Sequence, residues 1–256
     1  MKENKILIIK FGGLGDVVLS LDAMYSIKNN YKKSKLTLLT EKPYDDILEK
    51  SGWFDEIVLI KRSLFYFLDI FQIKKKLDVH SFSKVFDLQT SKRSSAYLKV
   101  FAKIGVYTNG VGRFAKTCHS NPHRNFLHTS ERQKEQLKLS KIDIKKDLKL
   151  NWLYPPLKKE KKRFALIVPG GSLKRKNKRI PVEVYSSIIE LFLAKKIKPV
   201  LIGSKDDQQI CETLKKRFLS LENLCNKTDF FEITKLSKQA IVSVGNDTGP
   251  MHLISR

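Results

Sequence analysis

Short apolar runs of strand length alternate with helix-length segments along most of this chain, and this alternation restricts the fold more than any other feature. In the first half the runs are Lys5–Phe11, Leu36–Thr40, Glu56–Ile60 and Lys84–Leu88, and each is followed by a segment with helical spacing. Successive strands joined by helices form parallel pairs, and strands buried on both faces are apolar throughout. The sequence therefore predicts an α/β fold with doubly wound parallel sheets.

The alternation breaks once near the middle of the chain and then restarts. Residues 154–163 combine two prolines with a run of charged side chains, which is typical of a linker. We therefore predict a first Rossmann-like domain over residues 1–153 and a second one over residues 164–256. The sequence stops a few residues after Pro250, where a helix is expected to begin. We expect the second domain to be incomplete at its C-terminus.

Residues 106–128 do not fit the alternation and are predicted to form a long loop. Cys118, His119, His123 and His128 lie in this segment and carry side chains that bind metals. They lack the paired CxxC or HxxxH spacing on a rigid element that zinc sites usually show, so we predict no metal site here.

The chain carries a large positive charge, with 50 Lys and Arg residues against 26 Asp and Glu residues and a formal net charge of +24. Such a charge attracts polyanions, among them nucleic acids, anionic membranes and phosphorylated substrates. Lysines outnumber arginines and are spread along the whole chain. Because recognition of bases favours the bidentate arginine side chain, we expect no nucleic acid as the main partner.

The cysteines and the apolar runs indicate a cytoplasmic location. Cys118, Cys211 and Cys225 form no CxxC pair, which favours a reducing compartment. The apolar runs are too short to span a membrane or to form the core of a signal peptide.

Two glycine-containing turns follow strands near the two ends of the sequence. One lies within Ile6–Asp16 and the other follows the strand Ala240–Val244. In the second turn, Asp247 and Thr248 are able to cap a helix in which Pro250 takes the first position. The N–H groups at such a helix start bind anions. We therefore expect a phosphate-type ligand held between the two predicted domains.

Six short stretches spread over nearly the whole chain carry a family resemblance. They are Ile6–Leu19, Phe86–Gln89, His128–Arg132, Val168–Pro181, Ile202–Asp207 and Ser243–Leu253. Together they resemble the ADP-heptose–lipopolysaccharide heptosyltransferases, which are inverting sugar transferases with the GT-B architecture. The resemblance implies two Rossmann-like domains and transfer of a heptose from ADP-heptose to the lipopolysaccharide inner core. The sequence departs from the family at Asp22, where a proline is common, and at its C-terminus, beyond which family members continue.

The resemblance implies that Asp16 is the general base that deprotonates the acceptor hydroxyl. Asp16 follows the first strand, where α/β folds place reactive groups. The residues alone also allow Asp16 to cap the following helix.

The resemblance further implies a donor site that lies mainly in the second domain. Lys178 would meet the diphosphate without a metal ion, and Asp207 or its neighbour Asp206 would hold the ribose. Asp207 is equally able to cap a helix. The implied donor-binding residues are Gly15, Ser172, Lys178, Asp207, Asp247, Thr248, Gly249 and His252. We expect no cofactor other than the nucleotide-sugar donor.

An anionic, lipid-linked acceptor requires cations on the first domain. We predict Lys92, Arg93, Arg113 and Arg124 as acceptor-binding residues, because they follow strands or lie in the irregular segment. A solvated surface is the alternative explanation for these side chains. With such an acceptor, the protein is expected as a peripheral protein at the cytosolic face of the inner membrane.

The segment Leu64–Leu77 is rich in aromatic residues and ends in lysines. We expect its aromatic side chains to pack on the sheet. The alternative is an amphipathic helix that rests on the membrane surface. The aromatic residues are Phe65, Tyr66, Phe67 and Phe71.

Two other functions remain open from the residues. An NAD-type oxidoreductase would use Glu41, after the second strand, to hold a ribose, but Val18 occupies the third glycine position of the dinucleotide motif. A non-catalytic polyanion-binding protein, such as a truncated relic of the transferase, would bind many polyanions in a salt-sensitive way.

Overall fold

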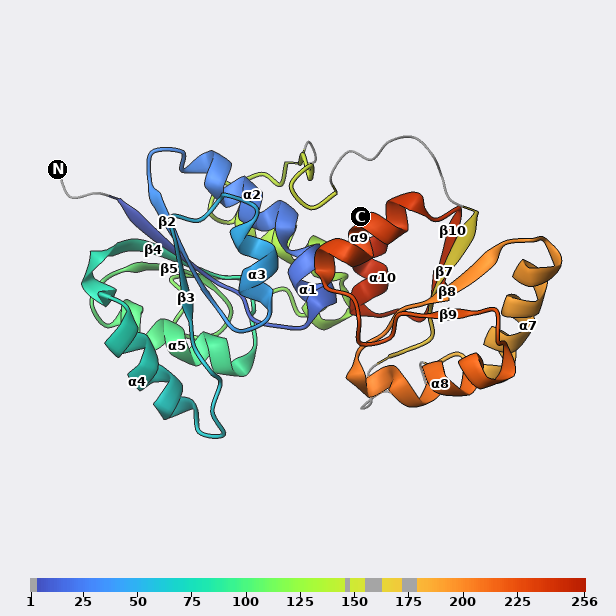
Figure 1. Ribbon diagram of the computed structural model, residues 1–256. Helices are drawn as coiled ribbons and strands as arrows, with labels where there is room; N and C mark the ends of the chain where they lie inside the picture. Colours follow the sequence, from blue (N-terminus) through green and yellow to red (C-terminus); the bar gives the residue numbers. More distant parts are fainter. Residues whose placement is uncertain (1–3, 146–147, 155–162, 172–178) are drawn as a thin grey trace. The chain divides into compact units, whose positions relative to one another are not determined.

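The computed structural model describes residues 4–145, 148–154, 163–171 and 179–256. The chain divides into two compact units, Met1–Lys149 and Leu150–Arg256, and each unit is built around one parallel sheet (Figure 1).

The first unit contains a six-stranded sheet in the order β3-β2-β1-β4-β5-β6, and every neighbouring pair is parallel. This is the strand order of a Rossmann fold, in which the chain starts in the middle of the sheet and winds outward in both directions. The strands are β1 (Lys5–Ile9), β2 (Lys35–Thr40), β3 (Glu56–Leu59), β4 (Phe82–Asp87), β5 (Tyr107–Gly110) and β6 (Thr117–Cys118). The helices are α1 (Leu14–Leu19), α2 (Leu21–Asn30), α3 (Tyr44–Glu49), α4 (Tyr66–Lys76), α5 (Lys92–Ala102) and α6 (Thr129–Lys138), with short 3-10 helices at Val79–Ser81 and Arg124–Phe126.

Helices cover both faces of this sheet. Helices α1, α2 and α6 contact one another, while α4 contacts α5, which also packs on β4 and β5 (Figure 1). Alternate residues of β1 serve the two faces. Leu7 and Ile9 join the core that includes Ile73 and Tyr97, and Ile8 is also fully buried. Because β1 is covered on both sides, its sequence is an unbroken apolar run.

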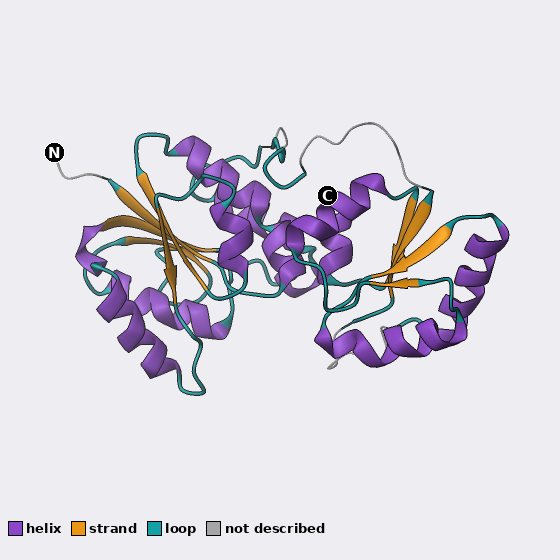
Figure 2. Ribbon diagram, viewed as in Figure 1, coloured by secondary structure: helices purple, strands orange, loops and turns teal. Residues whose placement is uncertain are grey.

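The second unit contains a four-stranded parallel sheet in the order β10-β7-β8-β9. Helices α7 and α8 contact each other, as do α9 and α10, and α9 also packs on β7 (Figure 2). The strands are β7 (Phe164–Val168), β8 (Lys198–Leu201), β9 (Glu222–Asn223) and β10 (Val242–Gly245). The helices are α7 (Val182–Ala194), α8 (Gln208–Arg217), α9 (Phe230–Gln239) and α10 (Gly249–Ile254), with a 3-10 helix at Lys205–Asp207. The predicted α/β class with parallel sheets is confirmed.

Leu153 and Tyr154, the last residue before the predicted linker and its first residue, pack within the second unit. The hydroxyl of Thr234 donates to the carbonyl oxygen of Leu153 at 2.7 Å, and the hydroxyl of Tyr154 donates to the carbonyl oxygen of Leu253. Residues 155–162 of the predicted linker lie outside the described residues.

The predicted loop at residues 106–128 contains two strands instead, β5 and β6. Strand β5 escapes a search for apolar runs because buried polar side chains occupy it. Thr108 donates to the carbonyl oxygen of Phe114 at 2.7 Å, and the Asn109 amide donates to the carbonyl oxygen of Gln136 at 3.1 Å. These partners satisfy the polar groups, so a strand without apolar periodicity is stable inside the sheet.

The predicted packing of the aromatic side chains of Leu64–Leu77 on the sheet is wrong. Helix α4 buries Asp69 and Ile73 and packs Ile70 partly against the core, whereas Tyr66, Phe67, Leu68 and Phe71 are exposed. The aromatic residues Phe65, Tyr66, Phe67 and Phe71 are all exposed.

A buried hydrogen-bond network ties the start of α4 to α5. Asp69 accepts from the backbone N–H of Ser63 at 2.8 Å, from Arg93 Nε at 2.6 Å and from the Tyr97 hydroxyl. Burial alone would raise the pKa of Asp69, but the hydrogen bonds from Ser63, Tyr97 and Arg93 outweigh it and hold the pKa below its ordinary value. Asp69 is therefore a charged anchor in an otherwise apolar contact.

None of the described helices is long and apolar enough to cross a membrane.

The Asp69 network provides a stability test. Asp69→Asn removes the charge that pairs with Arg93, and we expect the free energy of unfolding to fall by roughly 2–4 kcal/mol, since a partly buried guanidinium loses its partner. Urea unfolding followed by circular dichroism measures the change. The control is Asp46→Asn, which removes a carboxylate that pairs with Lys42 on the surface and should change the free energy by less than about 1 kcal/mol. Equal effects of the two substitutions would contradict the anchoring role.

Candidate active site

The glycine-rich turn after β1 brings Asp16 to the carboxyl end of the first sheet. Asp16 lies in the first turn of α1 and is exposed, while Gly13 is the N-cap residue of that helix and no side chain caps it. The alternative that Asp16 caps the helix is therefore wrong. A Cβ atom at Gly12 would lie 2.3 Å from Cε2 of Tyr44, so a larger residue there would displace the Tyr44 ring. Gly15 lies beside Asp16 in the same helical turn.

Two buried ionisable groups lie at the same edge of the sheet. Lys10 directly follows β1, and Asp87 ends the neighbouring strand β4. Asp87 accepts from the N–H of Thr90 at 3.0 Å and from the Ser94 hydroxyl at 2.9 Å, yet burial raises its pKa to about 6. Burial lowers the pKa of Lys10 to about 8, and the charges of Asp16 and Asp87 oppose this shift. Lys10 is thus a cation in the field of the predicted base.

The first unit has a hollow of about 480 Å³ at the N-terminus of α5. Three of the predicted acceptor-binding residues line it, namely Lys92, Arg113 and Arg124. The hollow therefore combines three cations with the N-terminal end of a helix, and both favour an anion. The full lining is Thr90, Lys92, Ser95, Ala96, Val111, Gly112, Arg113, Phe114, His119, Asn121, Pro122, Arg124 and Asn125.

Partners hold the cations of this hollow in place. Arg124 donates through Nε to Nδ1 of His119 at 3.0 Å and through a terminal nitrogen to the Thr90 hydroxyl at 2.5 Å. Burial, followed by the nearby charge of Arg132, lowers the pKa of Arg124. The guanidinium of Arg113 lies 4.7 Å from the centre of the Phe114 ring.

Arg93, the fourth predicted acceptor residue, does not line the hollow. Its guanidinium donates to Asp69, Tyr97 and the carbonyl oxygen of Ser63. These contacts give Arg93 a structural task at the base of α4.

The histidines of the predicted loop do not converge on one point. His119 lies between Arg124 and Glu135, with Nε2 2.8 Å from the Glu135 carboxylate. Because Arg124 donates to Nδ1, that nitrogen is the acceptor, and a neutral His119 carries its proton on Nε2. His128 instead caps α6 through Ser130. Among the residues that the structure describes, no group of three His, Cys, Asp or Glu side chains is arranged to hold a metal ion.

In the second unit, the side chain of Asn246 connects three backbone segments at the carboxyl end of the sheet. Its amide nitrogen donates to the carbonyl oxygens of Pro169 at 2.8 Å and Gly170 at 2.7 Å, and its amide oxygen accepts from the N–H of Ile180 at 2.8 Å. Asn246 is fully engaged and buried. Asn246 lies inside the Ser243–Leu253 stretch that carries the resemblance, but its residue type and position alone indicate no role.

Two buried polar groups without partners flank Gly171. They are Nε of Arg179 and the hydroxyl of Thr248, which have no hydrogen-bond partner within the described part of the chain. A Cβ atom on Gly171 would lie 3.4 Å from Cγ of Arg179 and 3.6 Å from Cγ2 of Thr248. Thr248 is the N-cap residue of α10, and no cap hydrogen bond uses its hydroxyl. A hydroxyl and a guanidinium N–H beside a helix start suit an anionic ligand.

The remaining predicted donor residues differ in exposure and in their hydrogen-bond partners. Asp247 is exposed, with its carboxylate 3.2 Å from Nε2 of His252, and Gly249 is the first residue of α10. Asp207 is buried and accepts from the N–H of Gly171 and from the N–H and hydroxyl of Ser204. Its carboxylate thus completes a capping box with Ser204 at the 3-10 helix and orders the turn at Gly171, while as the N-cap residue of α8 it makes no side-chain cap hydrogen bond. Ser172 and Lys178 lie outside the described residues.

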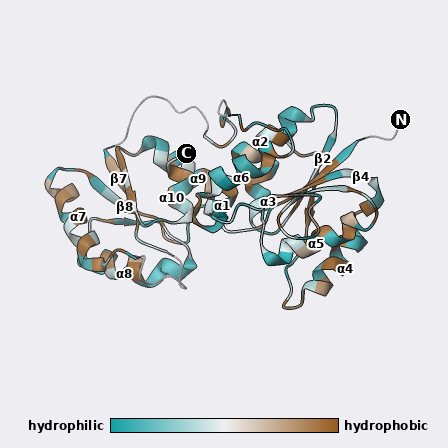
Figure 3. Cartoon of the chain, turned by 180° about the vertical axis from the view of Figure 1, so that it is seen from behind, coloured by the Kyte–Doolittle hydropathy of each residue, from teal (hydrophilic) through white to brown (hydrophobic). Residues whose placement is uncertain are grey.

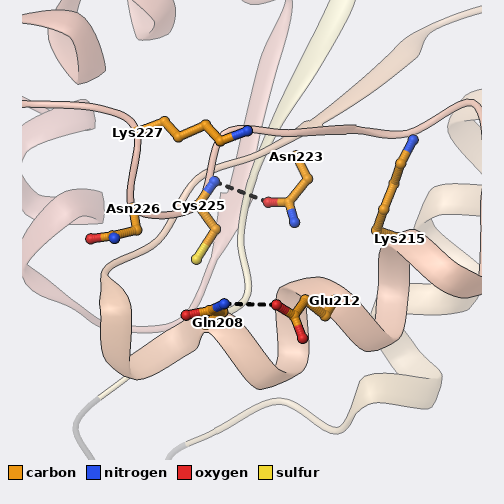
Figure 4. Close-up of a pocket in the computed structure, with 7 residues that line it drawn as sticks. All are labelled: Gln208, Glu212, Lys215, Asn223, Cys225, Asn226 and Lys227. Carbon is orange, nitrogen blue, oxygen red and sulfur yellow. Dashed lines mark hydrogen bonds between the residues drawn. The ribbon is translucent and has the colours of Figure 1, made fainter.

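A second hollow, of about 430 Å³, lies beside β9 and α8 in the second unit (Figure 4). Polar side chains dominate its wall, and Cys225 contributes a buried thiol. No predicted donor residue lines it. The lining residues are Gln208, Glu212, Lys215, Asn223, Cys225, Asn226 and Lys227.

Each Rossmann-like unit carries polar residues and glycines at the carboxyl ends of its strands. This is where doubly wound α/β proteins bind their ligands. The model of the family "Glycosyltransferase family 9 (heptosyltransferase)" matches residues 70–255. The chain therefore belongs to glycosyltransferase family 9 and is a glycosyltransferase.

Individual relatives agree with this assignment. A lipooligosaccharide heptosyltransferase 2 of Campylobacter jejuni is 25% identical over 254 residues, which cover 94% of this chain and 74% of the relative. The solved structure of E. coli heptosyltransferase WaaC with ADP has a TM-score of 0.76 at 18% identity, covering 98% of this chain and 84% of that chain. The E. coli ADP-heptose lps heptosyltransferase II has a TM-score of 0.71 at 16% identity, covering 98% and 81%. These structures confirm the GT-B fold.

The alternative of an NAD-type oxidoreductase is wrong, because the chain belongs to a glycosyltransferase family. Glu41, which would have held the ribose, pairs with Arg62, whose Nε lies 2.7 Å from the carboxylate. The Glu41 carboxylate also accepts from the N–H of Gly12 at 3.1 Å and so supports the glycine turn.

The raised pKa of Asp87 predicts a pH-dependent stability. The pKa of about 6 lies above the ordinary value of 3.8, so the folded state favours the protonated form. Protonated Asp87 therefore adds to the free energy of unfolding. This stabilisation is fully present below about pH 4 and is lost as the pH rises through about 6. In the original chain, the free energy of unfolding should fall by up to about 3 kcal/mol between these pH values. In Asp87→Asn this fall should be absent.

Urea unfolding at several pH values between 4 and 7 measures this difference. The control Asp143→Asn, at an exposed position, should keep the pH profile of the original chain. Parallel profiles for Asp87→Asn and the original chain would show that Asp87 titrates normally.

Proposed function

We propose that this glycosyltransferase moves a heptose from ADP-heptose to a hydroxyl group of the lipopolysaccharide inner core by a single inverting displacement. The observation that carries the proposal is the exposed carboxylate of Asp16 at the carboxyl end of β1, in a chain of the heptosyltransferase family. A carboxylate in this place is able to take the proton of an attacking hydroxyl. The names of the C. jejuni and E. coli relatives support the substrate class.

The donor diphosphate is proposed to bind around Gly171. The hydroxyl of Thr248 and Nε of Arg179 would donate to its oxygens, which would satisfy two buried groups that are otherwise unpartnered among the described residues. Asp247 would bind sugar hydroxyls, His252 would add a proton-bearing donor, and the N–H of Gly249 would meet phosphate at the helix start. By resemblance, Ser172, Lys178 and Gly15 complete the set.

These cations would offset the charge that develops on the leaving diphosphate, so the proposed mechanism requires no metal ion. Asp207 retains the ribose role only by resemblance. Its hydrogen bonds to Gly171 and Ser204 support a second role, in which it orders the turn that contacts the phosphates.

The acceptor is proposed to bind in the hollow lined by Lys92, Arg113 and Arg124. An inner-core acceptor carries carboxylate or phosphate groups, and three cations beside the α5 N-terminus suit such a ligand. Arg93 is omitted because Asp69 and Tyr97 occupy its guanidinium. Since the acceptor is lipid-linked, the enzyme is proposed to act at the cytosolic face of the inner membrane as a peripheral protein.

The role of Asp16 is tested by Asp16→Asn. We expect turnover with ADP-heptose and a lipopolysaccharide core acceptor to fall by about 10²–10⁴-fold, because the amide cannot accept the proton. The affinity for ADP, measured by calorimetry, should change by less than about twofold. Asp22→Asn, which alters an acid in the first turn of the next helix, is the matched control and should keep its activity.

Two results would count against this assignment. Equal losses of turnover and ADP affinity in Asp16→Asn would mean that Asp16 binds the donor. No ADP binding by the original chain at millimolar ligand, together with salt-sensitive binding to many polyanions, would favour the non-catalytic alternative.

The acceptor hollow is tested by Arg113→Gln combined with Lys92→Gln. We expect the KM for the anionic acceptor to rise roughly 10-fold to 100-fold with little change in kcat, since charge-assisted contacts to the bound anion are lost. Lys103→Gln, at the other end of α5, is the control and should leave the acceptor KM unchanged. An acceptor KM that does not respond to the double substitution would exclude the hollow as the binding site.

A further inference from the structure

Helix α4 and its lead-in present an apolar surface that is unusual for a water-exposed helix. Within eight consecutive positions, six large apolar side chains are exposed, by 43% to 89%. We call these residues the α4 surface, and they are Leu64, Phe65, Tyr66, Phe67, Leu68 and Phe71. Contiguous exposed apolar side chains of this kind mark interaction sites. Figure 3 shows the brown, hydrophobic segments along α4.

The α4 surface is organised by helical spacing. Phe67 and Phe71 are one turn apart on the same side of the helix, and Lys74 and Lys75 extend that side by one further turn. The rings of Phe65 and Phe67 stack with their centres 5.6 Å apart. The surface is therefore a cluster of aromatic rings with lysines at one end.

Hydrogen bonds of Asp69 and Gln72 fix the orientation of α4, so that the α4 surface faces the solvent. Asp69, on the opposite side of the helix, is fixed by Ser63, Arg93 and Tyr97. Gln72 also forms two hydrogen bonds with the backbone of Lys61 in the lead-in. The aromatic side chains cannot turn inward without breaking the buried Asp69 network.

The exposed charged side chains within residues 61–77 are all basic. Lys61, Lys74 and Lys75 are exposed beside it, and Asp69, the only acid within residues 61–77, is buried. Aromatic rings with adjacent lysines match the boundary between the acyl chains and the headgroups of an anionic bilayer. A second copy of the chain fits less well, because two such surfaces face to face would bring lysines of like charge together.

We propose that the α4 surface docks on an anionic lipid membrane, with Phe67 and Phe71 inserted at the headgroup boundary and Lys74 and Lys75 against the lipid charges. The proposal names the surface that produces the peripheral location given under the proposed function, and it rests on that function only for the identity of the membrane. Attachment and sugar transfer are separate events, so each can fail without the other.

The test is sedimentation with vesicles of phosphatidylethanolamine and phosphatidylglycerol, compared with vesicles of phosphatidylcholine alone. The full chain should bind the anionic vesicles in a salt-sensitive way. Phe67→Ser with Phe71→Ser, and separately Lys74→Gln with Lys75→Gln, should each weaken binding by roughly tenfold or more. Lys32→Gln with Lys33→Gln, an exposed lysine pair elsewhere on the same unit, and Leu219→Ser, an exposed apolar residue of the other unit, are the matched controls and should bind like the original chain.

Two further measurements keep the result decisive. All variants should keep the thermal midpoint of the original chain, since the altered side chains are exposed, and they should keep transfer to a short, detergent-free acceptor. Unchanged vesicle binding in the aromatic variant would overturn the proposal. So would a dimer of the original chain that this variant converts to a monomer without an effect on vesicle binding, because the surface would then join two copies.

Discussion

Parallel pairing of β1 with both β2 and β4 is the constraint on which the first unit depends. This pairing makes β1 a central strand, and its side chains are buried beneath the helices on both faces, so the reactive polar residues that follow β1 and β4 lie where these strands end. Lys10, Asp87 and the turn that carries Asp16 all lie at this edge. The second unit repeats the arrangement, since Gly170 and Gly171 follow β7 and Asn246 follows β10. In each unit, therefore, the candidate functional residues lie at the carboxyl edge of the parallel sheet.

Much of this architecture could be predicted from residue patterns, because strands buried on both faces leave unbroken apolar runs. The failures have a common physical cause, which is burial of polar side chains by distant partners. Strand β5 was missed because Thr108 and Asn109 are satisfied by Phe114 and Gln136. The orientation of α4 with its aromatic side chains toward the solvent depends on Asp69 and Arg93, which are 24 positions apart in sequence. No local periodicity records such a pair.

The candidate site shows the same limit at the level of single residues. A sequence cannot separate an aspartate that reacts from one that orders a turn, because both follow strands and precede helices. The contacts separate them: Asp207 accepts three hydrogen bonds from Gly171 and Ser204, whereas Asp16 is exposed and caps nothing. Asn246 was overlooked for the opposite reason. Its task is to join backbone segments, and backbone partners leave no trace in a sequence.

The Asp69 network also explains why an apolar helix face stays exposed. Two orientations of α4 compete, and the hydrophobic effect alone favours the one that buries Phe67 and Phe71. That orientation would expose Asp69 and leave the Arg93 guanidinium and the Tyr97 hydroxyl without their common partner. An uncompensated group of this kind costs several kcal/mol, comparable to the gain from two aromatic rings. A buried ion pair is therefore able to decide which face of a helix meets the solvent.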